Sequence, residues 1–247
     1  MPEGDTIFRT ARTLHRALSG QTVTRFETVL PKLARIDCDT PLAGRTVDSV
    51  DARGKWLLMH FSGDLILLTH MLMSGSWHIY RPGEKWQRHR CHMRIVIETP
   101  PMLAVAFSVP VAEFHTAASL ARREGFNRLG PAPLAPDFDA ALAIANLAAH
   151  PELELGRALL NQTVLAGLGN VFKSEVAFAC GLSPFRRVAT LTPAQLAHLV
   201  TTARQYLFAN VTESSGHRRT TTGNTQREEN LFLVPGLPGV EFHEEGS

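Results

Sequence analysis

The chain opens with the stretch "MPEGDTIF", which puts a proline and a glutamate directly behind the initiating methionine. If the methionine is removed, Pro2 becomes the amino terminus and carries a secondary amine that is not part of an amide. An α-amino group has a pKa of about 8, against about 10.4 for lysine, so a useful fraction is free base at neutral pH. Such an amine is a candidate nucleophile toward a carbonyl-like carbon. Proline also suits the first turn before a helix, so this chemistry needs support from elsewhere in the chain.

A glycine-rich turn in the second half of the chain supplies that support. In "LNQTVLAGLGNVFKSE" it delivers Asn170 to the expected start, and cap, of a helix. Backbone N–H groups and the side-chain amide of this asparagine point to the same place there, which is typical of a phosphate-binding site. Such a turn alone is nevertheless more often a tight corner between two helices. Combined with the "MPEGDTI" start, the pattern GxGNxxxSE resembles the formamidopyrimidine-DNA glycosylase and endonuclease VIII family, over roughly residues 2–222.

The resemblance implies a bifunctional DNA glycosylase and abasic-site lyase that excises oxidised bases in base excision repair. Pro2 would attack the anomeric carbon of the damaged nucleotide, and the resulting iminium ion would act as an electron sink for elimination of the flanking phosphates. Glu3 would act as the general acid at the sugar ring oxygen. Because "PEGD" resembles the endonuclease VIII branch, we expect oxidised pyrimidines to be preferred over 8-oxoguanine.

Three further residues receive roles from the resemblance. Lys55, presented by a glycine turn in "DARGKWLL", matches a hairpin lysine that contacts a phosphate beside the lesion and assists catalysis. Asn170 matches the asparagine that binds the DNA backbone. Met73 falls where relatives carry a side chain that enters the duplex and fills the gap left by a flipped base, although a methionine in a strand is more often part of a core.

The pattern of apolar residues predicts an α+β fold in three parts. Residues 1–130 would form the catalytic part, an antiparallel β-sandwich with a leading helix that follows Asp5 as its N-cap and stops at Gly20. Short β-type runs such as "WLLMHFS", "DLILLTHMLM" and "HMRIVIE" are separated by Gly and Pro turns. Residues 131–216 would be a helical domain, in which the resemblance implies a helix-two-turn-helix element. Its segments include "GRALLNQTVLAGLGN" and a last helix capped by Thr192 with Gln195.

Residues 217–247 would be a truncated or degenerate finger. Relatives of this family usually end in a hairpin finger built on four zinc-binding cysteines, whereas the 24 residues after Gly223 contain none. The three cysteines of the chain are far apart, which indicates a reducing cytoplasm and no cysteine-rich zinc site. We therefore expect no metal and no cofactor. Relatives also usually carry a glutamate at the position of Thr6, so a supporting acid is missing there.

Composition limits the partners. A net charge of +2 does not by itself indicate a polyanion partner, although 21 of the 25 basic residues are arginine, which grips phosphate in a bidentate way. No apolar run reaches about 18 residues, so no membrane span is expected. We expect a monomer that acts on damaged DNA in the cytoplasm, associated with the nucleoid.

Two other functions stay open on the sequence alone. One is a homologue that has lost its finger and only binds damaged DNA, with little or no catalysis. The other is a tautomerase-like enzyme whose terminal proline serves as a base, although such enzymes have nothing like "GLGNVFKSE". Borohydride trapping of a covalent Pro2–DNA adduct would separate the lyase from both.

Overall fold

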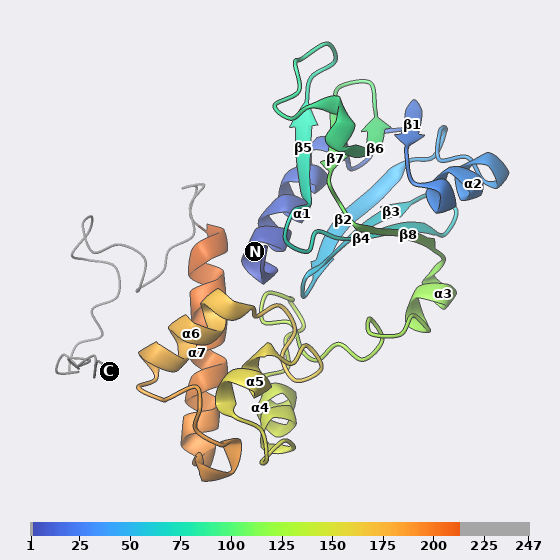
Figure 1. Cartoon of the computed structure of the whole chain (residues 1–247). Coiled ribbons are helices and arrows are strands. Elements are labelled where there is room, and N and C mark those ends of the chain that lie inside the picture. Colours follow the sequence, from blue (N-terminus) through green and yellow to red (C-terminus); the bar gives the residue numbers. More distant parts are fainter. Residues whose placement is uncertain (1, 213–247) are drawn as a thin grey trace. The chain divides into compact units, whose positions relative to one another are not determined.

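The computed structural model of the chain describes residues 2–212 (Figure 1). The predicted finger region 217–247 lies outside these residues. No helix within the described part is long and apolar enough to cross a membrane.

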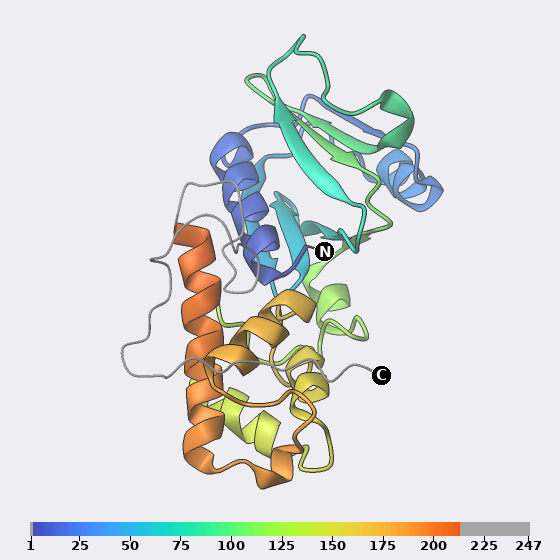
Figure 2. The ribbon, with the colours of Figure 1, turned by 60° about the vertical axis from the view of Figure 1, so that its left-hand side comes forward.

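The first half of the described chain contains two four-stranded antiparallel sheets (Figures 1 and 2). One sheet has the order β1 (Arg25–Thr28), β6 (Met93–Glu98), β7 (Leu103–Phe107), β5 (Ser76–Tyr80). The other has the order β2 (Val47–Arg53), β3 (Trp56–Phe61), β4 (Leu65–His70), β8 (Val111–His115). All pairings are antiparallel, and one core unites inward-facing side chains from both sheets, including Leu57, Met59, Leu67, Ile95 and Ile97. The predicted α+β fold with an antiparallel sandwich is confirmed.

The leading helix α1 (Gly4–Leu18) packs against β2, β3 and β5. Its buried apolar face contributes Ile7, Ala11, Leu14 and Leu18 to the sandwich core. Its N-cap is Glu3, so the prediction that Asp5 caps this helix is wrong: Asp5 is buried in the first turn and pairs with Arg9 at 3.7 Å. The predicted stop at Gly20 is confirmed, since the helix ends at Leu18 and Gly20 has a left-handed φ of 77°.

The second half is helical, as predicted. Its helices are α4 (Ala140–Ala148), α5 (Leu155–Leu160), α6 (Asn170–Ala179) and α7 (Pro193–Thr212), with a short 3-10 turn η2 (Val188–Thr190) before α7. A separate core of leucines, valines and aromatic residues holds them together. The predicted cap of the last helix is confirmed: the Thr192 hydroxyl accepts from the Gln195 amide, and the Gln195 side chain accepts from the Thr192 amide.

Several elements differ from the sequence prediction. The elements β2, β8, α2 (Pro31–Asp39), η1 (Arg90–His92) and α3 (Ala117–Ala121) were not predicted, because they are short or carry few apolar residues. The predicted strand "DLILLTHMLM" ends at His70, since Leu72 adopts a left-handed φ of 46° that turns the chain. The predicted helix "GRALLNQTVLAGLGN" ends at Leu160, where the Asn161 side chain accepts from the Thr163 amide and forms a turn.

Candidate active site

The Glu3 side chain joins the first residues of the chain to the helical half. It is fully buried, and its carboxylate accepts three backbone N–H groups at the start of α6. Oε2 accepts from Gly169 at 2.8 Å and from Phe172 at 3.3 Å, and Oε1 accepts from Val171 at 2.9 Å. A carboxylate at a helix N-terminus satisfies the unpaired donors there and interacts favourably with the helix dipole. Glu3 therefore caps α6 from the other end of the sequence.

This arrangement corrects the prediction that Asn170 caps α6. The N-cap residue is Gly169, and Asn170 is the first helical residue. Gly169 has no room for a side chain, because a Cβ atom there would lie 2.4 Å from Cδ of Glu3. Asn170 is exposed, and among the described residues its side-chain amide has no hydrogen-bond partner, so that amide is available to a ligand.

Three glycines bring three distant segments into backbone contact next to Glu3. The Gly4 amide donates to the Gly167 carbonyl at 2.9 Å. Gly167 has a φ of 109°, and a Cβ atom on it would lie 3.6 Å from Cα of both Gly4 and Gly54. We call Gly4, Gly54 and Gly167 the glycine junction. It fixes the start of α1, the β2–β3 turn and the turn before α6 against one another.

The glycine junction positions Pro2 and Lys55. Pro2 precedes Glu3 and is partly exposed, and Lys55 follows Gly54 in the β2–β3 turn and is half-buried. Burial lowers the pKa of the Lys55 ammonium group, and the negative charge of Glu3 opposes this shift. The structure thus brings together the predicted catalytic residues Pro2, Glu3 and Lys55 with Asn170 at the start of α6.

His70 belongs to the same region, and the sequence reasoning missed it. It pairs across the strands with Trp56, the residue after Lys55, and the two rings meet edge to face with centroids 4.7 Å apart. Burial, followed by the positive charges of Lys55 and Arg123, lowers the pKa of His70 to about 4. Its Nδ1 accepts from the Leu72 amide at 3.1 Å, so the proton of the neutral ring lies on Nε2. Pairing the two predicted strands in register would have found this residue.

Met73 lies in the turn between β4 and β5, three residues beyond His70. It is 72% exposed, and the neighbouring Leu72 is 46% exposed, whereas Met71 is buried at 2%. Met73 is therefore in a turn and outside the core. Leu72 was not predicted as a site residue, and its exposure makes it a second apolar side chain on this turn.

Two hollows flank α1. A groove of about 460 Å³ is lined by Thr6, Arg9, Trp77, His78 and Gln87, among others. A larger cavity of about 890 Å³ lies on the opposite face of α1, toward the segment 127–139. Neither hollow is lined by a predicted site residue, so the glycine junction, with Pro2, Glu3 and Lys55 beside it, is the better candidate for the chemistry.

Two protein-family profiles match the two halves of this chain. The profile of the formamidopyrimidine-DNA glycosylase N-terminal domain matches residues 1–109, and that of the formamidopyrimidine-DNA glycosylase H2TH domain matches residues 129–222. The chain belongs to this family.

Individual proteins that are similar to this chain support the same family assignment. The chain is 40% identical over 239 residues to a probable endonuclease 8 2 of Streptomyces coelicolor, covering 96% of this chain and 83% of the relative. It is 37% identical to the DNA-(apurinic or apyrimidinic site) lyase Nei2 of Mycolicibacterium smegmatis, covering 94% and 86%. The formamidopyrimidine-DNA glycosylase of Lactococcus lactis, solved with DNA containing an abasic site, superimposes with a TM-score of 0.74 over 85% of this chain and 82% of its own, at 21% identity.

Proposed function

We propose that this protein is a bifunctional DNA glycosylase and abasic-site lyase of base excision repair, acting through the amine of Pro2. The observation that carries the proposal is the burial of Glu3 against the start of α6. Because Glu3 is anchored there, the adjacent Pro2 is held at the start of α1, and the charge of Glu3 acts on Lys55. Membership of the family and the names of the relatives support the same activity.

The proposed reaction begins with attack of the Pro2 nitrogen on C1′ of the damaged nucleotide, while the bond from C1′ to the base breaks and the base leaves with a proton. Opening of the sugar ring then gives an iminium ion. Loss of a proton from C2′ expels the 3′ phosphate, and a second elimination expels the 5′ phosphate. Water finally hydrolyses the iminium ion and returns the free amine of Pro2.

Glu3 is proposed to donate the proton to the sugar ring oxygen. Both carboxylate oxygens accept N–H bonds in the resting protein, and these bonds fix the orientation of the carboxyl group. The bond from the Phe172 amide is the longest, at 3.3 Å, and is the weakest of the three. Glu3 therefore combines a structural role, as the cap of α6, with the proposed catalytic one.

The other predicted residues would bind the DNA around this centre. Lys55 and Asn170 offer an ammonium group and an exposed amide to the phosphates beside the lesion. Met73, exposed at the end of its turn, would enter the duplex and fill the space of the flipped base. We propose oxidised pyrimidines as the preferred substrates and the chromosome in the cytoplasm as the place of action, with the protein working as a monomer and without a cofactor.

Borohydride trapping tests the proposal. Incubation with a duplex containing an abasic site and sodium borohydride should give a covalent adduct, and peptide mapping should locate it on Pro2. A matched control keeps an uncleaved residue before Pro2, so that its nitrogen is an amide, and should give none; intact mass checks both proteins. EDTA should leave incision unchanged. Absence of the adduct would favour the binding-only or tautomerase-like alternatives, and activity restored by magnesium would indicate a hydrolytic endonuclease.

A further inference from the structure

The outer face of the sheet β2-β3-β4-β8 carries an ion-pair network that the proposed reaction does not use. Glu113 on β8 lies opposite Leu68 on β4, and Trp56 on β3 lies opposite His70. Opposite residues share a face of the sheet, and residues two apart on one strand share it too. Glu113, His70 and Trp56 therefore project on the same side.

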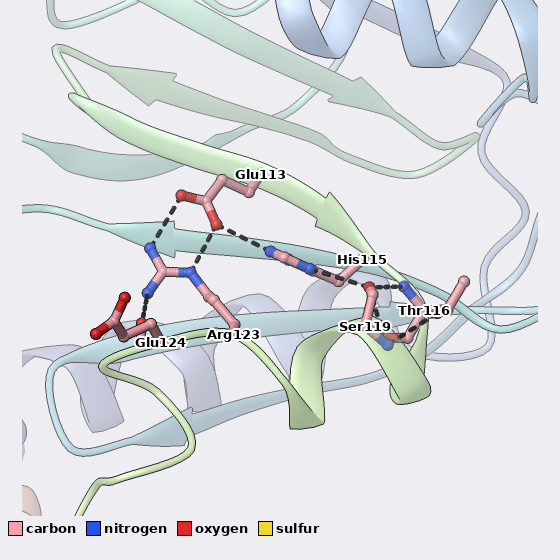
Figure 3. Close-up of polar contacts among 6 residues, drawn as sticks. All are labelled: Glu113, His115, Thr116, Ser119, Arg123 and Glu124. Carbon is pink, nitrogen blue, oxygen red and sulfur yellow. Dashed lines mark hydrogen bonds and ion pairs between the residues drawn. The ribbon is translucent and has the colours of Figure 1, made fainter.

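Arg123 connects Glu113 with Trp56, and its pairing with Glu113 is drawn in Figure 3. It lies in the segment after α3 that crosses this face, where Leu120 and Phe126 pack onto Leu58 and Leu68. Its Nε and Nη2 atoms donate to the two Glu113 carboxylate oxygens at 2.6 and 2.9 Å. A bidentate guanidinium–carboxylate pair fixes the plane of the arginine as well as its position.

Glu113 is itself fixed from the other side. His115 Nε2 lies 2.9 Å from Oε2 of Glu113, and its Nδ1 lies 3.1 Å from the Ser119 hydroxyl (Figure 3). Ser119 exchanges hydrogen bonds with Thr116 in the capping box of α3. The hydrogen bonds of Arg123, together with those of His115, lower the pKa of Glu113 to about 2, so the carboxylate stays charged. The network is thus held at both ends by the backbone.

The guanidinium of Arg123 reaches the candidate active site through Trp56. Its Cζ atom lies 4.2 Å from the Trp56 ring centroid, a close cation–π contact. The same ring meets His70 edge to face at 4.7 Å and Phe126 at 6.3 Å. Lys55 directly precedes Trp56 in the chain. Pairwise contacts therefore run without a break from Glu113 to Arg123, then to Trp56, and then to His70. Trp56 is the residue next to Lys55.

We propose that Arg123, held by Glu113, is a positioning residue for His70 at the candidate site: it fixes the Trp56 ring and, through that ring, the orientation of His70. This inference rests on the proposed function. His70 then meets a phosphate as a neutral Nε2–H donor held by the Leu72 amide, and Lys55 meets it as the neighbouring cation. Arg123 is only partly exposed and acts without touching DNA itself.

A double-mutant cycle tests this role. We would measure the affinity for a duplex containing tetrahydrofuran, an abasic analogue that cannot be cleaved, in the wild type, R123Q, H70N and the double variant. R123Q should bind about tenfold more weakly, a size typical of coupling between contacting residues, but should cost less than twofold once His70 is absent. R123K, which keeps the charge but not the fork, should fall between R123Q and the wild type. R122Q, at the exposed neighbouring arginine, should stay within twofold of the wild type in both backgrounds.

For each protein whose DNA affinity is measured, thermal unfolding shows whether the variant is folded. A merely structural role predicts the same tenfold loss with and without His70, and that result would overturn the inference. If R123Q does not fold, E113Q breaks the same fork from the opposite side and is measured in its place. A wild-type protein that forms no borohydride adduct would refute the proposed function and this inference together. A wild type that forms the adduct while R123Q binds normally would refute the inference alone.

Discussion

Two turns at the same end of one sheet differ in how they are held. The β2–β3 turn, with Gly54 and Lys55, packs against the turn before α6, and a Cβ atom on Gly54 would lie 3.0 Å from that of Ala166. The β4–β5 turn, with Leu72 and Met73, exposes both side chains. The paired residues Trp56 and His70 stand at the bases of the two turns.

The difference matches the work that each turn is proposed to do. Lys55 must meet a phosphate at one defined point relative to Pro2, so its turn is fixed by backbone contacts that leave no space for side chains. Met73 must enter a duplex whose local sequence varies, and a flexible, unbranched side chain on an open turn suits that task. Substitutions in the packed region should therefore cost stability, whereas those on the open turn should change binding.

The largest effect is expected at Gly169. G169A puts a methyl group against the Glu3 side chain, where the nearest atom is 2.4 Å away, so the cap on α6 cannot form. We expect a loss of about 3 kcal/mol or more in the free energy of unfolding, measured by urea denaturation, with loss of trapping. G83A is the matched control. It has a left-handed φ of 81° but open space, and should cost only about 1–2 kcal/mol. Equal losses of unfolding free energy in G169A and G83A would show that the Glu3 side chain can move aside for the added methyl group at little cost.

The two methionines of the β4–β5 region should separate stability from binding. M71A removes a buried side chain and should cost about 2–4 kcal/mol of unfolding free energy. M73A removes an exposed one and should change unfolding by less than about 0.5 kcal/mol. M73A should nevertheless weaken binding to a lesion-containing duplex. If M73A binds normally in a fluorescence anisotropy titration, Met73 is not a wedge.

Replacement of Glu3 should affect both structure and chemistry. In E3Q an NH₂ group replaces one carboxylate oxygen and faces backbone N–H donors, so we expect a loss of about 1.5–3 kcal/mol in stability. Below the melting temperature of the variant, base excision should fall more than cleavage at preformed abasic sites, because the departing base needs the proton. Equal losses in the two assays would leave Glu3 with the capping role alone.

The smallest effect is expected from the titration of His70. Its folded-state pKa of about 4 lies below the ordinary 6.5, so the unfolded chain takes up the proton first. Stability should therefore fall as the pH drops from 6.5 to 4. In H70N the loss of unfolding free energy between pH 6.5 and 4 should be smaller than in the wild type by on the order of 1 kcal/mol. The difference is smaller than the full pKa shift would give, because the ring is partly exposed to solvent. Glu113, with a pKa of about 2 against 4.5, loses its contribution only below pH 4.5, so E113Q should leave most of this window unchanged.

Most of the fold followed from local signals in the sequence. The helix α1, with its strong apolar periodicity, and the helix α7, with its clear N-terminal cap, were predicted, as were the apolar strands β3 and β4. The strand β2 was missed because "VDSVDAR" has too few apolar residues to stand out. Its place in the sheet comes from pairing with β3, a long-range contact that local composition does not encode.

The site was predictable only where the family motif names a residue. Pro2, Glu3, Lys55, Asn170 and Met73 came from the resemblance, and their roles remain proposals. The capping of α6 by Glu3 was not predicted, because its partners lie 166 to 169 residues away in the chain. Arg123 was missed for a similar reason: its significance depends on the register that puts Glu113 and Trp56 on one face.

The long separation between Glu3 and α6 also has a consequence for how the protein is made. A ribosome adds roughly 5–20 residues per second, so the partners of Glu3 emerge about 8 to 34 seconds after it does. Throughout that interval the first residues cannot be buried at their final position. The enzyme that removes methionine therefore has access to the chain before folding closes the junction, and the free amine that the chemistry requires can be created before its surroundings exist.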